Sequence, residues 1–202
     1  MARRTDRGEE TRSRILAAAA AAFAERGYAG TSMNELVRAT GLTKGAFYFH
    51  FDSKEDLALE VFRWKHEEWQ AMVAEAIEEG ARALDQLVAV MGAVTECVEA
   101  DPSARSLGRL AGELSGDPRL ASVLDVQFRS WVEFSTDLLR RAQEEGDVRP
   151  DLDPREVSEV VVAGFIGLEH VSGTRGAGDL RRWSEALTGL VLDAIRAKEQ
   201  VT

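Results

Sequence analysis

Hydrophobic residues along this chain recur at steps of three and four, the spacing of one face of an α-helix. A first helix carries Ile15, Ala19 and Phe23 on one face. Residues rich in glycine, proline and aspartate separate the later segments, which is typical of helix ends. The pattern predicts further helices over residues 54–79, 86–99, 104–114, 119–145, 154–172 and 180–198. No segment alternates as a half-buried strand would, so the sequence predicts an all-α fold.

Residues 31–54, TSMNELVRATGLTKGAFYFHFDSK, contain two short helices around a glycine turn. Ser32 is suited to cap the first helix, with Glu35 as its capping-box partner three residues later. Gly41 ends this helix, and Thr43 begins a second one after a short turn. Two helices joined in this way are typical of a helix-turn-helix unit, whose second helix enters the major groove of DNA.

The start of this second helix has the chemistry that DNA requires. The backbone N–H groups of a helix N-terminus favour a phosphate, and the Thr43 hydroxyl adds a donor there. Lys44 in the first turn can reach a phosphate or a guanine edge. Gly45 and Ala46 keep the helix narrow enough for the groove and can contact a thymine methyl group.

An aromatic cluster follows the second helix. Tyr48, His50 and Lys54 supply a hydroxyl, an imidazole and an ammonium, which are donors suited to the flanking phosphates. We expect Phe47 and Phe51 to pack inward.

At these residues the chain resembles the TetR family of bacterial repressors, over a region from about Arg12 to about Leu59. The resemblance implies a three-helix DNA-binding domain over residues 1–54 and a larger helical domain for ligand binding and dimerisation over residues 55–202. It also implies DNA contacts at the matching positions, which are Thr31, Ser32, Thr43, Lys44, Gly45, Ala46, Tyr48, His50 and Lys54.

Structural roles are alternative interpretations for several of these residues. Thr31 and Ser32 can be helix caps and nothing more, since capping alone explains them. Tyr48 and His50 can be packing residues, because these types are often half-buried. Lys44 is the position that a structural role explains least.

Charge is divided unevenly along the chain, whose formal net charge is -10. Residues 1–54 contain nine Lys or Arg and six Asp or Glu, whereas the remainder contains sixteen and twenty-nine. Basic charge is therefore concentrated in the predicted DNA-binding segment, and the acidic remainder repels DNA. This division favours double-stranded DNA as a specific partner and argues against an architectural DNA-binding protein.

Two further features concern the compartment. Cys97 is the single cysteine, which excludes an intrachain disulfide, suits a reducing cytoplasm and is interpreted as a small buried hydrophobe. The basic N-terminus before an alanine-rich run imitates a signal peptide, but Glu9 and Glu10 interrupt it. The apolar run over residues 160–168 is far shorter than the ~20 residues of a membrane span. We expect a cytoplasmic protein without a membrane partner.

Catalytic and metal-binding patterns are absent from the sequence. His50, His66 and His170 belong to no H-E-x-x-H motif, and no nucleophile elbow or pair of metal-binding cysteines occurs. The glycine-rich residues 173–178 lack the Gly-Lys-Ser/Thr ending of a phosphate loop, and we interpret them as a connector. We therefore expect no enzymatic activity, no metal and no cofactor.

Each of the last two predicted helices carries an apolar stripe. Two such stripes from each of two chains can close a four-helix bundle. A two-fold dimer also doubles the DNA that is recognised, if its DNA-contacting helices lie ~34–36 Å apart. We expect a homodimer through these helices on a palindromic operator; the alternative is that both stripes serve only the monomer core. The stripes are Val157, Val160, Val161, Gly164 and Leu168, and Leu180, Trp183, Leu187, Leu190 and Ala194.

An aromatic group on the predicted helix over residues 119–145 is the candidate site for a small-molecule effector. Phe128, Trp131 and Phe134 form it, and Phe165 and Ile166 of the next helix can complete a wall. Ligand sites in helical bundles are largely apolar with a few polar groups, and an indole offers both a ring and an N–H donor. Ordinary core packing is the alternative for each aromatic residue.

Three stretches together look like the γ-butyrolactone receptor branch of the TetR family: TKGAFYFHFDSKEDLA, WVEFSTDLLRRAQEEGDVRPDLDP and GFIGLEHVSG. The resemblance implies a repressor of antibiotic or secondary-metabolite genes that a small γ-butyrolactone, butenolide or furan-type signal releases from DNA. The family's pocket tryptophan corresponds to Trp131. A multidrug-sensing TetR regulator with a promiscuous apolar pocket is the alternative, because it would share every feature of the helix-turn-helix.

Overall fold

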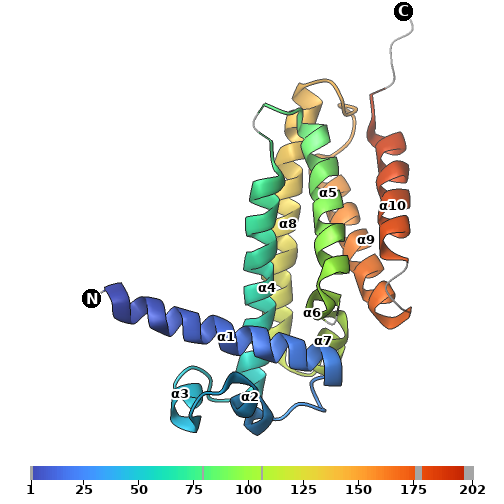
Figure 1. Cartoon of the computed structure of the whole chain (residues 1–202). Helices are drawn as coiled ribbons and strands as arrows, with labels where there is room; N and C mark the ends of the chain where they lie inside the picture. The colour runs from blue at the N-terminus through green and yellow to red at the C-terminus, as the bar shows by residue number, and fades with distance from the viewer. Residues whose placement is uncertain (1, 79, 106, 176–178, 198–202) are drawn as a thin grey trace, which may run out of the picture. The chain divides into compact units, whose positions relative to one another are not determined.

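A computed structural model describes residues 2–78, 80–105, 107–175 and 179–197. These residues form ten helices and no β-strand, and one isolated antiparallel bridge joins Val148 to Arg196. The predicted all-α class is therefore confirmed. The helices are α1 (Ala2–Arg26), α2 (Met33–Thr40), α3 (Lys44–Tyr48), α4 (Lys54–Ala76), α5 (Ala83–Ala100), α6 (Pro102–Arg105), α7 (Leu107–Glu113), α8 (Pro118–Glu144), α9 (Pro154–Arg175) and α10 (Leu180–Ile195) (Figure 1).

The helix boundaries lie close to the predicted ones. Helices α4, α5, α8, α9 and α10 begin and end within three residues of the predicted positions, and residue 198, the predicted end of the last helix, lies outside the described residues. The predicted helix over residues 104–114 is instead two short helices, α6 and α7. None of the described helices combines the length and the apolar character that a membrane span needs.

The chain divides into two compact units. The first contains Met1–Glu67 and Asp101–Val123, and the second contains Glu68–Ala100 and Leu124–Thr202. This division differs from the predicted boundary after residue 54. The reason is that α1 packs against α6 as well as against α2, so a segment far along the sequence belongs with the N-terminal helices.

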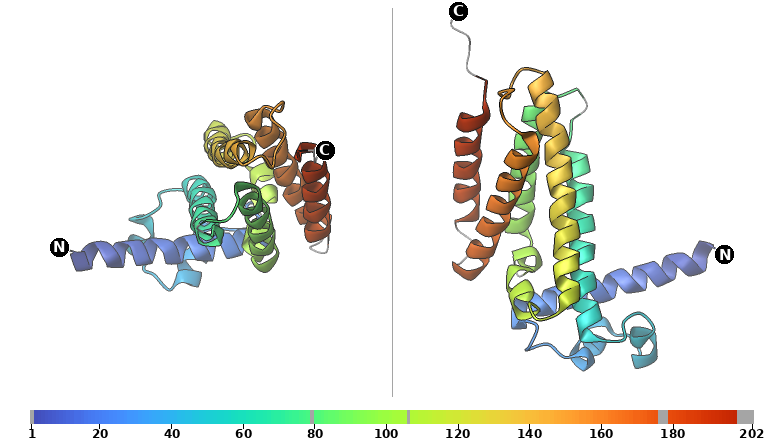
Figure 2. Two further views of the ribbon diagram at one scale, coloured as in Figure 1. Left: turned by 90° about the horizontal axis from the view of Figure 1, so that it is seen from above. Right: turned by 180° about the vertical axis from the view of Figure 1, so that it is seen from behind.

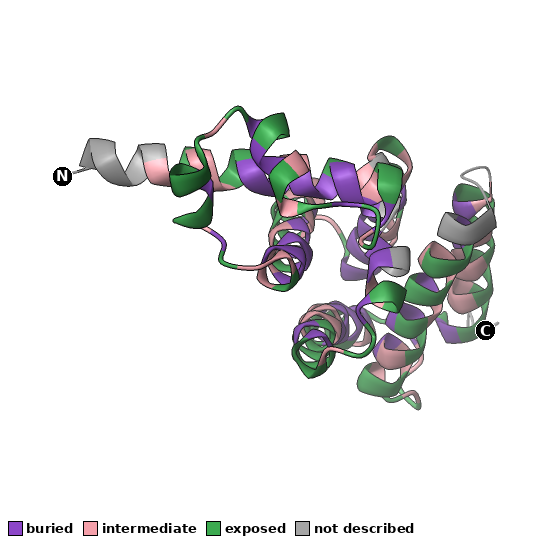
Figure 3. Cartoon of the chain, turned by 90° about the horizontal axis from the view of Figure 1, so that it is seen from below, coloured by how far each residue is buried: buried purple, intermediate pink, exposed green. Residues whose placement is uncertain are grey.

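The core of the first unit is built on one face of α1. Ile15, Leu16, Ala19 and Phe23 are at most 2% exposed, which confirms the predicted apolar face. Buried and exposed positions alternate along this helix (Figure 3). Burial of Leu57 and Val61 on α4 extends the same core.

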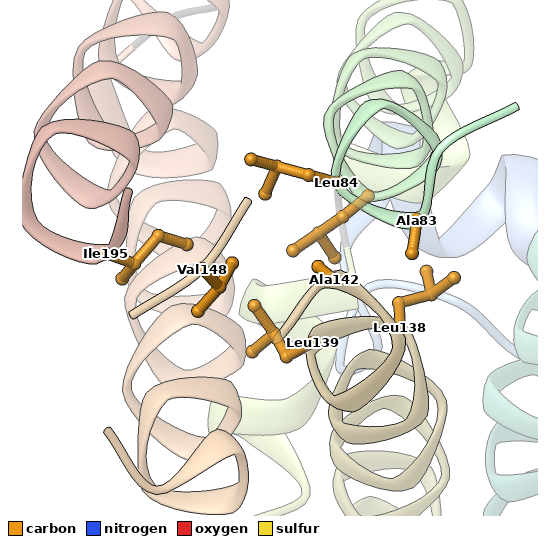
Figure 4. Close-up of a cluster of buried hydrophobic side chains, with 8 residues drawn as sticks. Ala83, Leu84, Leu138, Leu139, Ala142, Val148 and Ile195 are labelled. Atoms are coloured by element: carbon orange, nitrogen blue, oxygen red, sulfur yellow. The ribbon is translucent and has the colours of Figure 1, made fainter. Parts of the chain in front are cut away.

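The second unit contains a bundle in which α5, α9 and α10 lie side by side (Figures 1 and 2). On α9, Gly164 provides space for the Leu187 side chain of α10, which lies only 3.3 Å from the point where a β-carbon at residue 164 would stand. One cluster of buried side chains closes an end of this bundle (Figure 4). Its members are Ala83, Leu84, Leu87, Leu138, Leu139, Ala142, Val148 and Ile195.

A largely buried ion pair joins α4 to the start of α6 within the first unit. The Lys65 ammonium lies 2.6 Å from Asp101 Oδ2, and the lysine side chain is 7% exposed. Asp101 Oδ1 also accepts hydrogen bonds from the backbone N–H and hydroxyl of Ser103, at 2.8 and 2.7 Å. Burial by itself would raise the pKa of Asp101, but the hydrogen bonds from Lys65 and Ser103 outweigh it and lower the pKa.

Replacing Asp101 by Asn should lower the free energy of unfolding by about 2 kcal/mol, because a buried lysine loses its counter-charge. Since the native pKa of Asp101 is lowered, the wild-type contribution is present above the unfolded pKa and is lost as the pH falls through the native one. Urea unfolding followed by circular dichroism measures both effects. Asp151→Asn, in an exposed pair with Arg149, is the control and should change stability little. Equal stability of wild type and Asp101→Asn would contradict the account.

Candidate nucleic-acid interface

The first helix of the helix-turn-helix, α2, begins at a capping box. Ser32 Oγ accepts a hydrogen bond from Glu35 N at 3.3 Å, and Glu35 Oε2 accepts from Ser32 N at 2.9 Å and from the Ser32 hydroxyl at 2.7 Å. The hydrogen bonds from Ser32 lower the pKa of Glu35. The predicted capping box is thus confirmed, and it occupies the hydroxyl donor that Ser32 would otherwise offer to a phosphate.

Gly41 sets the turn between α2 and α3. Its φ of 65° lies in the left-handed region that favours glycine, and its N–H donates to Arg38 O at 3.2 Å. Two residues later Thr43 caps α3, where its hydroxyl oxygen accepts from Ala46 N at 3.2 Å. Both local signals identified in the sequence therefore have the predicted geometry.

The first turn of helix α3 is exposed, whereas the aromatic residues that anchor the helix to the core are buried. Thr43, Lys44, Gly45 and Ala46 are all exposed, and we call these four residues the α3 surface. Phe47 is fully buried and Phe51 is 4% exposed, which confirms that both pack inward. Among the described residues Lys44 has no hydrogen-bond or ion-pair partner, so its ammonium is available to a ligand.

Thr31 is buried inside the first unit, which argues against its predicted role as a DNA contact. It is 2% exposed, and its hydroxyl donates to Gly27 O at 2.8 Å. The residue therefore ties the segment before α2 to the end of α1, and neither a DNA contact nor a helix cap describes its role.

Lys54 also has an internal role in place of the predicted phosphate contact. Its ammonium donates to Tyr28 O at 2.9 Å and to Thr31 O at 3.0 Å, and it lies 4.1 Å from the centroid of the Tyr28 ring. A lysine held by two carbonyl oxygens and an aromatic face has little reach toward DNA. Sequence reasoning could not detect this because both partners lie more than twenty residues earlier.

The aromatic cluster after α3 is partly exposed. Tyr48 is 38% exposed and His50 is partly buried, so both remain candidates for contacts to the DNA backbone. Phe49, which the sequence analysis passed over, is 84% exposed and meets the His50 ring edge to face, with centroids 5.4 Å apart. The exposure of Phe49 could have been predicted from helical spacing. Since Phe47 and Phe51 share the inward side, the residue midway between them faces outward.

Arg38 is a second candidate that the sequence analysis did not identify. Arg12 pairs with Glu60 and lies over the Phe51 ring, and Arg14 donates to Thr40 O at 2.8 Å. Arg38, exposed in the last turn of α2, has no such partner in the part of the chain that the structure describes. Together with Lys44 it forms the accessible positive charge beside the turn.

The candidate effector residues lie in the second unit. Trp131 and Phe134 of α8 meet edge to face, with ring centroids 6.2 Å apart, and Phe134 also packs against the buried cluster of Figure 4. Phe128 lies one turn before Trp131 on the same side of α8, and both are partly buried. This arrangement brings three of the five predicted residues together.

Phe165 and Ile166 of α9 differ in how far their side chains are buried. Phe165 is 8% exposed and faces inward, whereas Ile166 is 44% exposed. Adjacent residues on a helix point about 100° apart, which is why the two side chains differ in burial. Phe165 is the more deeply buried of the two, and the place of Ile166 in the effector site stays a prediction.

A cavity of about 440 Å³ lies in the first unit. Its lining includes Ala17 and Ala21 of α1, Trp64 and Lys65 of α4, and Asp101, and it contains none of the five predicted effector residues.

The turn geometry, the two caps and the exposed first turn of α3 are those of a helix-turn-helix unit. Comparison with known proteins agrees. The family model described as bacterial regulatory proteins, tetR family, matches residues 15–61, and the one described as tetracyclin repressor-like, C-terminal domain, matches residues 82–178. The chain belongs to the TetR family.

Three relatives illustrate the similarity. The A-factor receptor protein of Streptomyces griseus is 32% identical over 178 residues, and the match covers 87% of this chain but only 60% of that receptor's length. The structure of native TylP, a TetR regulator from Streptomyces fradiae, is 33% identical with a TM-score of 0.72, covering 95% of this chain and 89% of the other. A γ-butyrolactone receptor described as ArpA-like is 30% identical with a TM-score of 0.68, covering 95% and 90%.

Lys44→Ala and Lys54→Ala should separate the two kinds of lysine. Lys44→Ala should abolish specific operator binding in a gel-shift assay and leave the dimer and the thermal unfolding temperature unchanged, because Lys44 has only external partners to lose. Lys54→Ala should lower the unfolding temperature, because the hydrogen bonds from its ammonium to Tyr28 O and Thr31 O are lost. The control is Arg140→Ala, an exposed substitution on α8 in the second unit. Specific binding by Lys44→Ala would remove this residue from the interface.

Proposed function

We propose that this protein is a ligand-released transcriptional repressor that binds a palindromic DNA operator as a homodimer. The observation that carries the proposal is the α3 surface, which presents an unpartnered lysine and two small residues on a capped helix. This surface belongs to the one segment of the chain with a positive charge balance, so phosphate attraction and base contact coincide there. Thr43, Lys44, Gly45, Ala46, Tyr48 and His50 are its proposed contacts, with Arg38 and Phe49 added from the structure.

We further propose that the effector is a γ-butyrolactone, butenolide or furan-type signal and that the regulated genes direct antibiotic or secondary-metabolite formation. The support is the similarity to an A-factor receptor and to a γ-butyrolactone receptor. Within this chain, Phe128, Trp131, Phe134 and Phe165 supply aromatic walls of the kind that hold a small apolar molecule. The Trp131 ring would pack on the ligand.

The proposed dimer uses α9 and α10. The predicted stripes divide in the structure: Leu180 and Val161 are buried within the chain, whereas Val160 and Leu190 are 68% and 71% exposed. Val171 on α9 is also 40% exposed. The monomer core thus accounts for only part of each stripe, and the exposed part is a surface that a second copy can cover.

Helix α4 is the proposed connection between effector and DNA. It contributes residues to both compact units. Near one end Gln70 Nε2 donates to Ser130 Oγ at 3.0 Å, next to Trp131, and at the other end Lys54 holds the segment between α1 and α2. A ligand that favours one arrangement of α8 can therefore displace α4 and change the spacing of the two α3 surfaces in the dimer.

Trp131→Ala should keep operator binding and lose release by effector. The direct assay uses fluorescence anisotropy on DNA from upstream of the protein's own gene, with a synthetic γ-butyrolactone as probe. Wild-type protein should leave the DNA as the lactone is added, and the variant should need at least about tenfold more lactone, because a buried aromatic contact is lost. Normal release of Trp131→Ala would overturn the proposed pocket.

Leu190→Glu should convert the dimer to a monomer, since it places a charge at an apolar interface. Analytical ultracentrifugation measures the mass in solution, and operator affinity should fall together with dimerisation. Val126→Glu is the matched control: Val126 is 56% exposed on α8 and lies outside the proposed interface. A Leu190→Glu protein that remains dimeric would contradict the assignment of this surface.

A further inference from the structure

One face of α9 carries an acidic residue in a buried stripe. Ser158, Val162, Phe165, Glu169 and Ser172 recur at steps of four and three, so they share one side of the helix. The other four members are between 0% and 8% exposed. Glu169 is partly buried and lies one turn beyond Phe165, a residue of the proposed effector site.

The serine hydroxyls of this stripe, and two buried hydroxyls of α8, are already in use within their own helices. On α9, Ser158 donates to Pro154 O at 2.8 Å, and Ser172 donates to Glu169 O at 2.9 Å. On α8, Ser135 donates to Trp131 O at 2.8 Å, and Thr136 donates to Val132 O in the same way. In the described part of the chain no hydrogen bond or ion pair engages the Glu169 carboxyl, which therefore keeps its capacity for a ligand.

Most of the described arginines on α8, α9 and α10 are paired with other carboxylates. Arg181 of α10 pairs with Glu96 and Glu99 of α5, and Arg182 pairs with Asp179. The α8 pairs are Arg129 with Asp125 and Arg140 with Asp137, and on α9 itself Arg155 pairs with Glu159 while His170 is exposed. No described cation pairs with Glu169. Burial is the cause that raises the pKa of Glu169 to about 7.

We propose that the Glu169 carboxyl is the polar anchor of the effector site and that it donates a hydrogen bond to the carbonyl oxygen of an uncharged, lactone-type effector. An isolated carboxylate in an apolar wall is costly, whereas the neutral acid is both cheaper to bury and able to donate. The acid thus fixes the orientation of a ligand that the aromatic rings hold by contact. This inference rests on the proposed function and adds to it the polar contact that selects the ligand.

The test compares two substitutions in the anisotropy release assay, with a synthetic γ-butyrolactone that bears an alkyl chain as probe. Glu169→Gln keeps an N–H donor, so the lactone concentration for half release should stay within about threefold of wild type. Glu169→Met keeps the size and removes the donor, so that concentration should rise roughly 10- to 100-fold. Glu159→Gln, on the same helix but outside the stripe, is the matched control and should match wild type.

Two results of this assay would overturn the inference. An equal loss in Glu169→Gln and Glu169→Met would show that a hydrogen-bond donor at this position is not what holds the lactone. Unchanged release in both variants would place Glu169 outside the site. The operator affinity of each variant is measured without lactone, and the half-release concentrations are compared after correction for any difference in that affinity.

A second measurement separates this inference from the proposed function. Carbon-13 NMR of the Glu side-chain carboxyl groups, with Glu169→Gln to assign the signal, gives the Glu169 pKa without any effector. A titration near pH 7 is the expected result, and an ordinary acidic titration overturns the inference while leaving the proposed function intact. A third result is that Glu169 titrates near pH 7 but the lactone does not release wild-type protein from DNA. That result would overturn both the proposed effector class and the proposed hydrogen bond from Glu169 to a lactone.

Discussion

The ammonium of Lys54 holds the DNA-contacting part of the first unit to helix α4. It donates to the carbonyl oxygens of Tyr28 and Thr31, in the segment between α1 and α2, and lies against the Tyr28 ring. Carbonyl groups after a helix end lack helical partners. The lysine supplies a donor to Thr31 O and adds a second one to Tyr28 O, which also accepts from Thr31 N at 3.2 Å. These contacts join the start of α4 to the segment before the helix-turn-helix, and in the proposed mechanism they pass a displacement of α4 on to α3.

Helix α3 has only five residues and depends on the rest of the first unit for its stability. A helix as short as α3 has little stability alone, so its shape comes from Thr43 at its start and from Phe47 and Phe51 in the core. The inward anchors leave the opposite side free for DNA. Internal partners occupy Arg12, Arg14 and Lys54, and Lys44 and Arg38 remain accessible. The structure thus divides the basic residues into those that build the unit and those that can face a phosphate.

Local features could be predicted from the sequence, and contacts between distant residues could not. Helix spacing, the Ser32–Glu35 capping box and the turn at Gly41 depend on neighbours within four residues, and all were found as expected. The roles of Thr31 and Lys54 depend on partners elsewhere in the fold. The sequence of a motif does not show whether a lysine side chain points inward or toward the solvent. The same reason explains why the sequence did not show that α6 belongs with α1. The different burial of Phe165 and Ile166 likewise depends on how α9 is oriented in the bundle, which the sequence alone did not show.

In the proposed repressor, two α3 surfaces that a dimer holds at a fixed spacing bind one operator. Hydroxyl-radical footprinting of the protein on its upstream DNA tests this most directly. The account predicts two protected regions on one face of the duplex, with centres about one helical turn, roughly 10 base pairs, apart. It also predicts that both regions lose protection together when the effector is added. A single protected region, or protection that spreads evenly along the DNA, would contradict the account.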